Sequence, residues 1–441
     1  MAPLPELGVG IVWWPPLDPL YNAAEGLVSV VEAEPEAYWV PKETTEGRGF
    51  CSALAEALGG VSQAKLLHGV GAPFGGTCRP PPGHQAAFAG DVARLRPAWI
   101  SEHLSFSRFR VDAGEAVFGG FLLPPAQSRQ GAVAAAKNIR CRRAGLDGIP
   151  VAFETGVSYL PPLPGEIADG EFAATVAEEA DCGILLDLHN LYCNARNGRQ
   201  PVTEFCASLP LDRVWELHLA GGQDLDGFRL DAHSGLVDAE LFEMAADLVP
   251  NLPNLSAVIF EIMPDFVPVV GLSAVARQLE RLHDLWARRR HAAGSVAGNR
   301  GHRTEPPANP HPEPSSWEAL LGNAITGLAV PKPPAELAAW WQAAGPAVNL
   351  YRQLAQEARA GSLVATAPRT VAKLLQQRAP LGLRRLLGEF WTRSPPGYTA
   401  IEEGIAFLRF IAGLASAAEE VAEAVRDDEE ACRQWLGCRT S

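Results

Sequence analysis

The chain has 441 residues, of which 47% are hydrophobic and 20% charged, and this composition excludes a chain that is disordered throughout. Its 51 acidic and 37 basic residues give a formal net charge of −14, which disfavours general binding to nucleic-acid phosphates. No apolar run reaches the roughly 18–20 residues that span a bilayer, and no secretory signal is recognisable, so we expect a cytoplasmic protein without a nucleic-acid or membrane partner.

Eight short apolar runs rich in β-branched residues recur through residues 1–290 and predict β-strands. They are Leu7–Trp13, Leu27–Glu32, Ala64–Val70, Ala98–Leu104, Pro150–Glu154, Gly183–Leu188, Val214–Leu219 and Ala257–Ile262. Segments with helical character, such as Gly170–Ala180 and Asp238–Leu248, lie between most of them. This alternation predicts parallel pairing, and eight such units match the size of a TIM-like (β/α)8 barrel. A doubly wound open sheet is the competing topology.

The composition changes after the barrel segment. Residues 291–316 are almost all small, polar or Pro, which predicts a Pro/Gly-rich linker between two separate cores. Residues 317–441 are rich in Ala, Leu, Glu and Arg, and the stretches Trp317–Leu328 and Ile401–Val425 carry apolar residues three to four positions apart. We therefore expect a small all-α C-terminal domain.

Polar residues gather at the ends of six predicted strands, where a (β/α)8 barrel carries its functional side chains. They are His68, His103, Glu154, Asp187, His189, Asn190, His218, Asp231, His233 and Glu261. Each alone could be a hydrogen-bonded structural residue, but a charged residue within an apolar strand is costly unless it is paired or binds a metal. Imidazole and carboxylate donors without thiolates favour iron, manganese or zinc, and eight candidate ligands suggest two or three metal ions.

Six motifs, in this order, resemble those of the multinuclear non-heme iron-dependent oxidative enzymes, a family that includes the iron enzyme of methanobactin biosynthesis. They are SEHLSF, FETGVSY, LLDLHNLYCNARN, ELHLAGG, LDAHSGLVD and FEIMPDFVP, and the resemblance covers roughly residues 5–285. It implies a barrel that holds two or three irons in mixed valence. It further implies that O2 is a co-substrate in the oxidative modification of a ribosomally made precursor peptide, usually at cysteine, in natural-product maturation.

The resemblance also implies a set of site residues. The implied iron ligands are His68, His103, Glu154, Asp187, His218, Asp231, His233 and Glu261, with Asn190 as a ligand or a neighbour of one. Of these, His103, Glu154 and Asp187, together with His189, are the expected catalytic residues. The chain departs from the family at Glu36–Ala37, at His189 where Asn is common, and at Ser234 where an acid is common. His189 is then an extra ligand or base, or a hydrogen-bonding neighbour.

The C-terminal segment faintly resembles the helical partner proteins that stand beside these enzymes and are thought to present the precursor peptide. Between Arg352 and Arg393 basic residues outnumber acidic ones, so an acidic leader peptide could dock there, with Arg384 and Arg385 as candidate substrate-binding residues. A separate partner protein would then be unnecessary. A solvated basic face on an unrelated helical cap is the alternative.

Two other functions remain open from the sequence. A divalent-metal sugar isomerase or an endonuclease-like barrel enzyme needs the same carboxylates and histidines, but no redox metal. A peptide-binding module with structural metals is the alternative that is not an enzyme.

Overall fold

The computed structural model describes residues 4–21, 26–44, 47–111, 114–289, 312–329, 332–377, 380–414 and 419–438. Most of the predicted linker, residues 291–311, therefore lies outside the described residues. No helix in the described part of the chain is long and apolar enough to cross a membrane.

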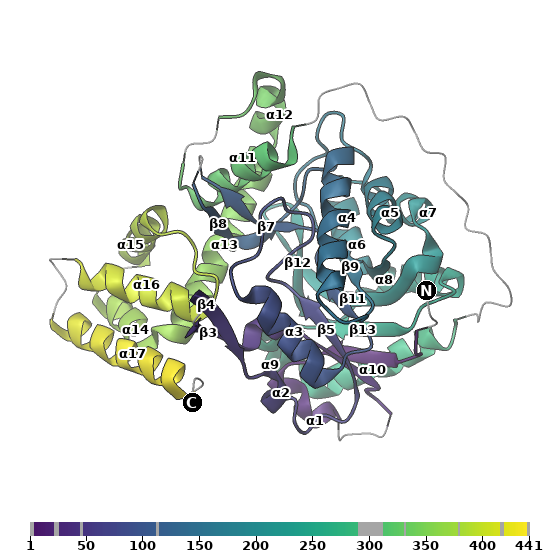
Figure 1. Ribbon diagram of the computed structural model, residues 1–441, viewed down its shortest axis with the longest axis horizontal. Coiled ribbons are helices and arrows are strands. Elements are labelled where there is room, and N and C mark those ends of the chain that lie inside the picture. Colours follow the sequence, from purple (N-terminus) through teal and green to yellow (C-terminus); the bar gives the residue numbers. More distant parts are fainter. Residues whose placement is uncertain are drawn as a thin grey trace.

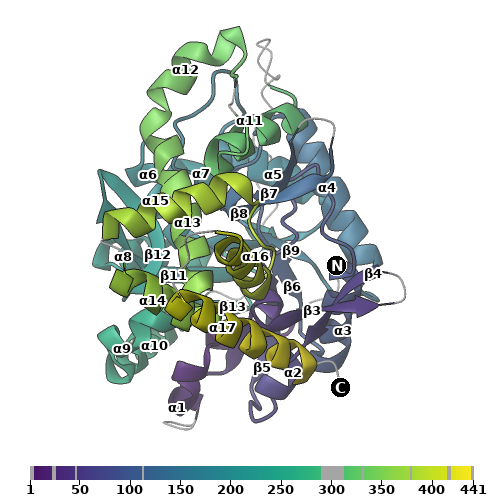
Figure 2. The same cartoon turned by 90° about the vertical axis from the view of Figure 1, so that its left-hand side faces the viewer.

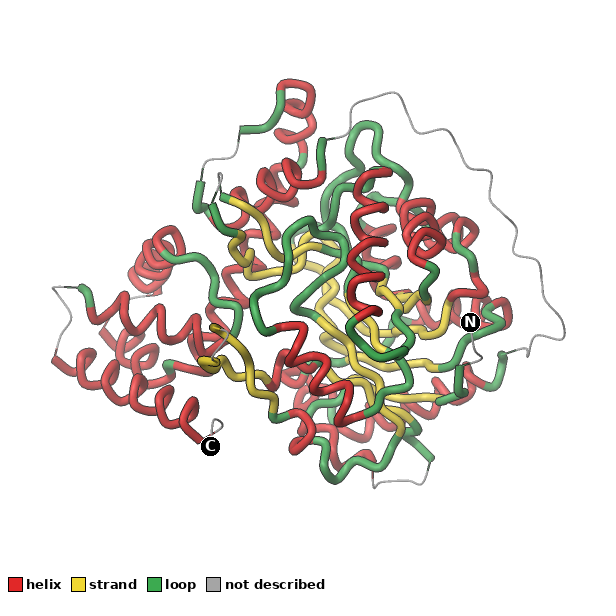
Figure 3. The backbone as a smooth tube through the Cα atoms, in the orientation of Figure 1, coloured by secondary structure: helices red, strands yellow, loops and turns green. Residues whose placement is uncertain are grey.

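Eight parallel strands form the predicted barrel, at the centre of the molecule in Figures 1 and 3. In sheet order they are β6 (Ile100–Glu102), β5 (Ala64–Gly69), β2 (Val30–Ala33), β1 (Gly8–Val12), β13 (Ala257–Glu261), β11 (Val214–Leu225), β10 (Gly183–Asp187) and β9 (Ala152–Glu154). Parallel bridges from Ile100 to Val151 and from His103 to Glu154 join the first strand of this order to the last. All eight predicted strands are confirmed, and the closure rules out the doubly wound open sheet.

Helices surround the barrel and bury one apolar face against it. They are α1 (Asp18–Tyr21), α2 (Leu54–Ala57), α3 (His84–Leu95), α4 (Arg129–Ala144), α5 (Asp169–Ala180), α6 (Leu188–Arg196), α7 (Val202–Ser208), α8 (Ala239–Leu248), α9 (Val267–Val270) and α10 (Leu272–Trp286). In α10, Val275, Leu279 and Leu282 are buried at a spacing of three to four residues, which places them on one stripe. Such stripes and the strand side chains form the main core.

Three antiparallel strand pairs are added to the parallel barrel, and the sequence analysis did not predict them. The hairpins are β3 (Trp39–Thr44) with β4 (Gly47–Ser52) and β7 (Phe106–Arg110) with β8 (Ala116–Leu123). The strand β12 (Phe228–Gly235) pairs back onto β11, which continues six residues beyond the predicted end at Leu219. All three pairs follow the carboxyl ends of barrel strands, so they build up the end of the barrel that carries the predicted site.

The C-terminal region is all-α, as predicted. Its helices are α11 (Pro314–Thr326), α12 (Ala338–Ala343), α13 (Gly345–Thr366), α14 (Pro368–Gln377), α15 (Pro380–Arg393), α16 (Ala400–Ala412) and α17 (Glu419–Cys438). Figure 2 shows α14, α16 and α17 side by side. The predicted linker, residues 291–316, overlaps the start of α11 at Pro314. The stretch Ile401–Val425 contains most of α16 and the beginning of α17.

The expectation of two separate cores is also wrong. Trp317, Leu321 and Tyr351, from α11 and α13, pack into one buried cluster with barrel residues such as Phe106 and Tyr159. Figure 1 shows α11 and α13 beside β7 and β8, whereas α14–α17 form a group to one side. That group has a core of its own, with Phe390, Phe407 and Leu408 among its members, to which Leu363 at the end of α13 also belongs. Half of the C-terminal region is therefore an added layer of the barrel.

Candidate metal centre

The register of the barrel strands brings the predicted site residues to one level at the carboxyl end. His103 lies opposite Glu154 where the barrel closes, and Asp187 lies opposite His218 on the neighbouring strand. Glu261 ends the next strand along, opposite Ala220. Side chains at the ends of adjacent parallel strands point into the same space, so residues far apart in sequence become neighbours.

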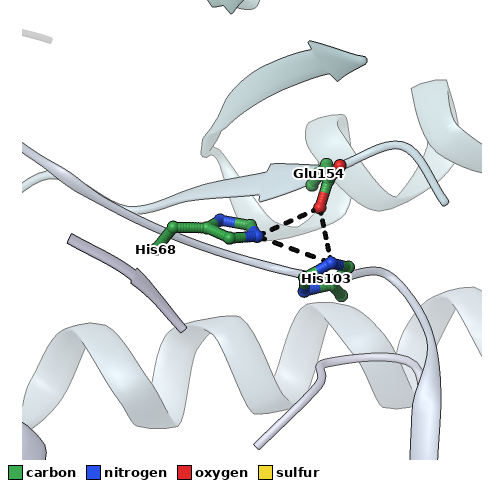
Figure 4. Close-up of side chains that lie close together, drawn as sticks. All are labelled: His68, His103 and Glu154. Carbon is green, nitrogen blue, oxygen red and sulfur yellow. Dashed lines mark hydrogen bonds and ion pairs between the residues drawn. The ribbon is translucent and has the colours of Figure 1, made fainter. Parts of the chain in front are cut away.

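His68, His103 and Glu154 form the first group of donors (Figure 4). One oxygen, Glu154 Oε2, lies 3.2 Å from His68 Nε2 and 2.9 Å from His103 Nε2, and the two Nε2 atoms are 3.5 Å apart. The Nδ1 atoms of both rings form hydrogen bonds on the side away from Glu154. His68 Nδ1 lies 2.8 Å from Ser101 Oγ, and His103 Nδ1 lies 3.2 Å from the Gly69 carbonyl oxygen. This arrangement orients both imidazoles so that Nε2 faces the carboxylate, as in metal-ligating histidines.

Further donor groups adjoin this one and share members with it. In the described part of the chain, four sets of three donors lie within 4.8 Å of one another. Besides the first group, they are Glu154–Asp187–His218, Asp187–His233–Glu261 and Glu32–Glu216–His218. Glu154, Asp187 and His218 each belong to two sets, so the four sets form one continuous group of donors. The number of metal ions, two or three, stays a prediction.

Buried polar atoms without hydrogen bonds accumulate at the same place. Among the described residues they include Glu154 Oε2, Asp187 Oδ2, His233 Nε2 and both ring nitrogens of His218. His218 Nε2 lies 2.7 Å from Glu32 Oε2, yet the pair does not have hydrogen-bond geometry. Unpaired buried polar atoms are rare in native proteins because they cost free energy. Imidazole and carboxylate lone pairs that converge in this way fit a bound cation.

The pKa shifts show how charge is distributed in the centre. Burial alone would lower the pKa of His103, but the Glu154 carboxylate outweighs it and holds that pKa well above its ordinary value. Burial would raise the pKa of Glu154, but His103 and His68 hold it well below its usual range. Burial, followed by Glu154 and Asp231, raises the pKa of Asp187 well above its usual range. Asp187 thus lies among other carboxylates without enough positive charge, which a cation would supply.

Asp231 and His233 lie on β12, the strand that returns along β11. His233 Nε2 is 2.7 Å from Asp231 Oδ1, and His233 Nδ1 is 3.1 Å from Glu261 Oε1. The backbone of His233 is left-handed, with φ of 44°, a conformation that is uncommon for residues other than Gly and is often found at functional sites. The Asp231 backbone N–H donates to Tyr159 Oη at 3.1 Å, which fixes the start of this segment.

His189 and Asn190 lie in the first turn of α6, two and three residues after Asp187. Asn190 Nδ2 donates to Glu154 Oε1 at 3.1 Å, so it anchors the shared carboxylate. His189 is fully buried, with Nε2 at 3.7 Å from Asp231 Oδ1 and 3.6 Å from Cys193 Sγ. Burial lowers the pKa of His189 to about 4, which makes it a neutral imidazole beside the centre.

The sequence analysis missed several acids of the centre. Glu32 and Glu216 form a donor set with His218, and the partly buried Glu34 interacts electrostatically with Glu261. Burial, followed by the charge of Glu261, raises the pKa of Glu34 to about 7, although His68 and His103 act in the opposite direction. Glu32 and Glu216 could have been found, since each interrupts an apolar strand. Glu34 lies just beyond the β2 strand end and had no comparable signal.

Arg384 and Arg385 are exposed on α15, in the group of helices that lies to one side of the barrel (Figure 1). Other basic residues of this stretch are engaged elsewhere. Arg359 is buried and pairs with Glu403 at 2.7 Å, and Arg352 donates to the Ala324 carbonyl. The structure therefore leaves a smaller basic face than the sequence count indicated.

A pocket of about 940 Å³ lies at the opposite end of the barrel, among residues that precede the strands, such as Pro150 and Ser256. It contains none of the predicted metal ligands. Functional side chains in such barrels lie at the carboxyl ends of the strands, so donor chemistry rather than cavity size identifies the site.

Comparisons with known proteins match the barrel segment of the chain. A model of the family described as "RiPP precursor modification enzyme MbnB/TglH/ChrH" matches residues 8–284. A UPF0276 protein of Chromobacterium violaceum is 30% identical over 217 residues, which are 49% of this chain and 76% of the relative. A UPF0276 protein of Anaeromyxobacter sp. is 32% identical over 210 residues, which are 47% of this chain and 70% of the relative.

Two solved structures are weakly similar to this chain. A xylose isomerase domain containing protein of Salmonella typhimurium has a TM-score of 0.40 at 12% identity, and the match covers 65% of this chain and 99% of that one. Endonuclease IV from Thermus thermophilus has a TM-score of 0.37 at 15% identity, covering 64% and 99%.

Proposed function

Because the chain belongs to the MbnB/TglH/ChrH family of RiPP precursor modification enzymes, we propose that it is a multinuclear non-heme iron enzyme. In this proposal it uses O2 to modify a ribosomally synthesised precursor peptide oxidatively, at a cysteine. The observation that carries the proposal is the chain of donor sets linked through Glu154 and Asp187. Such a chain can hold two or three ions close together, and its nitrogen and oxygen donors suit iron.

The proposed ligands are His68, His103, Glu154, Asp187, Asn190, His218, Asp231, His233 and Glu261. When bound, the iron would supply the redox chemistry and the affinity for O2 and thiolate that the protein side chains lack. The protein groups orient this set. Ser101 and the Gly69 carbonyl fix the first two imidazoles, and Asn190 holds Glu154.

His103, Glu154, Asp187 and His189 are the proposed catalytic residues. His103 is the most accessible of these ligand side chains, at 17% exposed, so substrate can approach the centre from its side. His189 is neutral and lies next to Asp231, where it can accept or donate a proton. Low exposure of the whole group excludes bulk water, which protects reactive species from side reactions.

The C-terminal region is proposed to recruit the precursor, which would make a separate partner protein unnecessary. Arg384 and Arg385 are the candidate contacts, since both are exposed and cationic. Fusion raises the effective concentration of peptide at the barrel without changing the intrinsic rate.

The test combines metal analysis with turnover. We expect purified protein to contain at least two irons per chain and to consume O2 only with a peptide, of which a Cys-containing precursor encoded beside this gene is the first candidate. Mössbauer or EPR spectra identify coupled iron, and mass spectrometry identifies the modified residue. Stoichiometric zinc, with no activity gained after anaerobic iron loading, would reject the proposal. Turnover of a sugar or a nucleic acid with a non-redox metal would favour the isomerase or endonuclease alternative.

A further inference from the structure

A second pocket, of about 590 Å³, lies on the outer side of the barrel, between the segment that follows β5, the strand β7 and the helix α4. Four cationic residues line it, Arg79, Arg108, Lys137 and Arg142, and none of its lining residues in the described chain is acidic. We call it the cationic pocket. Its charge is opposite to the net charge of −14 of the whole protein, so it concentrates attraction for anions.

Unpaired hydrogen-bond donors line the same pocket. Arg142 is only 4% exposed, and its Nη1 has no hydrogen-bond partner among the described residues. The same holds for Ser107 Oγ and Gln85 Nε2, which are also buried. Buried donors are normally paired, because leaving one unpaired costs its full desolvation. Three lining residues therefore carry buried hydrogen-bonding groups that no described residue uses.

The nearby acids neutralise only part of this charge. Glu102 Oε2 forms an ion pair with Arg142 Nη2 at 3.7 Å and also accepts from the Ala72 backbone N–H at 3.2 Å, whereas no acid in the described part of the chain pairs with Arg79 or Lys137. Glu318, from α11, accepts from the backbone and side chain of Thr77. Burial, followed by Glu318, raises the pKa of Cys78, a lining residue, so this thiol adds no negative charge.

Hydrogen bonds connect the wall of the cationic pocket to the metal centre. The Phe74 N–H donates to the carbonyl oxygen of His103, a proposed iron ligand, at 2.9 Å. Asn138 Nδ2 donates to the carbonyls of Phe74 and Gly76 at 2.8 and 2.7 Å, which ties the segment to α4. A peptide that reaches the metal centre on the side of His103 would therefore pass close to this wall.

We propose that the cationic pocket binds a carboxylate-bearing segment of the peptide substrate. The inference rests on the proposed function, since it assumes that the substrate is a peptide. The volume exceeds the needs of a single inorganic anion and is typical of sites for larger ligands. Apolar walls from Pro73, Phe74, Pro80 and Ala134 also suit a peptide, because they can pack against its side-chain carbons.

The experiment measures binding of fluorescein-labelled hexaglutamate to the full-length protein by anisotropy, with hexaglutamine as the neutral comparison. The pocket variant is Arg79→Gln/Lys137→Gln, which removes two exposed cations. The matched control is Arg110→Gln/Arg140→Gln, which removes the same charge from β7 and α4 outside the pocket. We expect the pocket variant to bind hexaglutamate about tenfold more weakly, and the control to change by less than about twofold. The difference should shrink as salt is raised.

Other outcomes would overturn the proposal. Equal losses in the pocket variant and the control would show that only overall charge matters. A loss confined to Arg384→Gln/Arg385→Gln would place the peptide contact on α15 instead. Binding of inorganic phosphate without binding of hexaglutamate would assign the pocket to a small anion rather than a peptide.

The proposal and the proposed function can fail separately, because anisotropy requires neither iron nor O2. Hexaglutamate binding at the pocket without peptide-dependent O2 consumption would leave the pocket standing and reject the oxidase. With a precursor that is turned over, the pocket variant should raise KM about tenfold and leave kcat unchanged, since the pocket lies outside the metal centre. An unchanged KM would reject the pocket while the oxidase stands.

Discussion

Removal of residues 312–441 should destabilise the barrel, because α11 and α13 complete one of its cores. Trp317, Leu321 and Tyr351 are at most 1% exposed and pack with barrel residues. Burial of one large apolar side chain contributes about 1.5–3 kcal/mol, so three contribute about 5–9 kcal/mol. A typical domain is stable by only about 5–15 kcal/mol. The truncation would also expose Phe106 and Phe109, which are fully buried in the intact protein.

A shorter truncation, of residues 368–441, is the matched comparison. It removes α14–α17, whose core is largely their own, and keeps α11 and α13 on the barrel. It breaks the buried pair of Arg359 with Glu403, so a smaller loss of stability is expected here too. The assay is urea unfolding followed by tryptophan fluorescence, with dye binding as a measure of exposed apolar surface. The longer truncation should lower the urea midpoint more, and bind more dye, than the shorter one. If it unfolds at the midpoint of the intact protein, the shared core does not stabilise the barrel.

Three further changes test the site and its supports. His103→Ala should lose most of the bound metal without unfolding the barrel. The control His283→Ala, on α10 and remote from the centre, should keep its metal. Equal metal content of the two variants by elemental analysis would contradict the assignment of His103 as a ligand. Tyr159→Phe removes the acceptor for the Asp231 N–H and should weaken metal affinity about tenfold by titration, while an unchanged affinity would show that this bond does not position the ligand. Burial raises the pKa of Glu318 from 4.5 to about 7, so its protonated form favours the folded state. This contribution to the free energy of unfolding is complete below pH 4.5 and is lost as pH rises through 7, by up to about 3 kcal/mol. Urea midpoints between pH 5 and 8 should fall less in Glu318→Gln, and parallel profiles would refute this sign.

The barrel could be predicted because its strands are buried on both faces and read as continuous apolar runs. In β13, for example, Val258, Ile259 and Phe260 are all fully buried. The candidate ligands followed from the same pattern, since a polar residue at the end of such a run marks the carboxyl end of a strand. His68 and Glu154 were identified in this way, and the closed order of the strands brings them within 3.2 Å.

Contacts between distant parts of the chain could not be predicted in this way. Trp317 Nε1 donates to the Pro124 carbonyl, almost two hundred residues away, and α11 packs on the hairpin β7–β8. A Trp at a helical spacing looks the same in a sequence whether it faces its own domain or another one. The composition of residues 291–316 indicated a boundary, but a boundary in composition does not establish a boundary in packing. Only the surface against which a helix packs decides whether it belongs to its own domain or to the barrel.

The buried charge of the barrel explains why a metal belongs to its structure as well as to its chemistry. Glu32, Glu154, Asp187, Glu216 and Glu261 are all buried, and these carboxylates outnumber the histidines in the donor sets. Burial, followed by Glu32, raises the pKa of Glu216 to about 7. A cluster of this kind is stable only if protons or cations complete its charge balance. Protons neutralise the carboxylates one at a time, whereas a divalent ion held by a shared carboxylate neutralises two at once and uses the lone pairs that otherwise remain unpaired. We therefore predict that a bound metal ion would stabilise the fold, because it would use as ligands the donors that otherwise cost free energy.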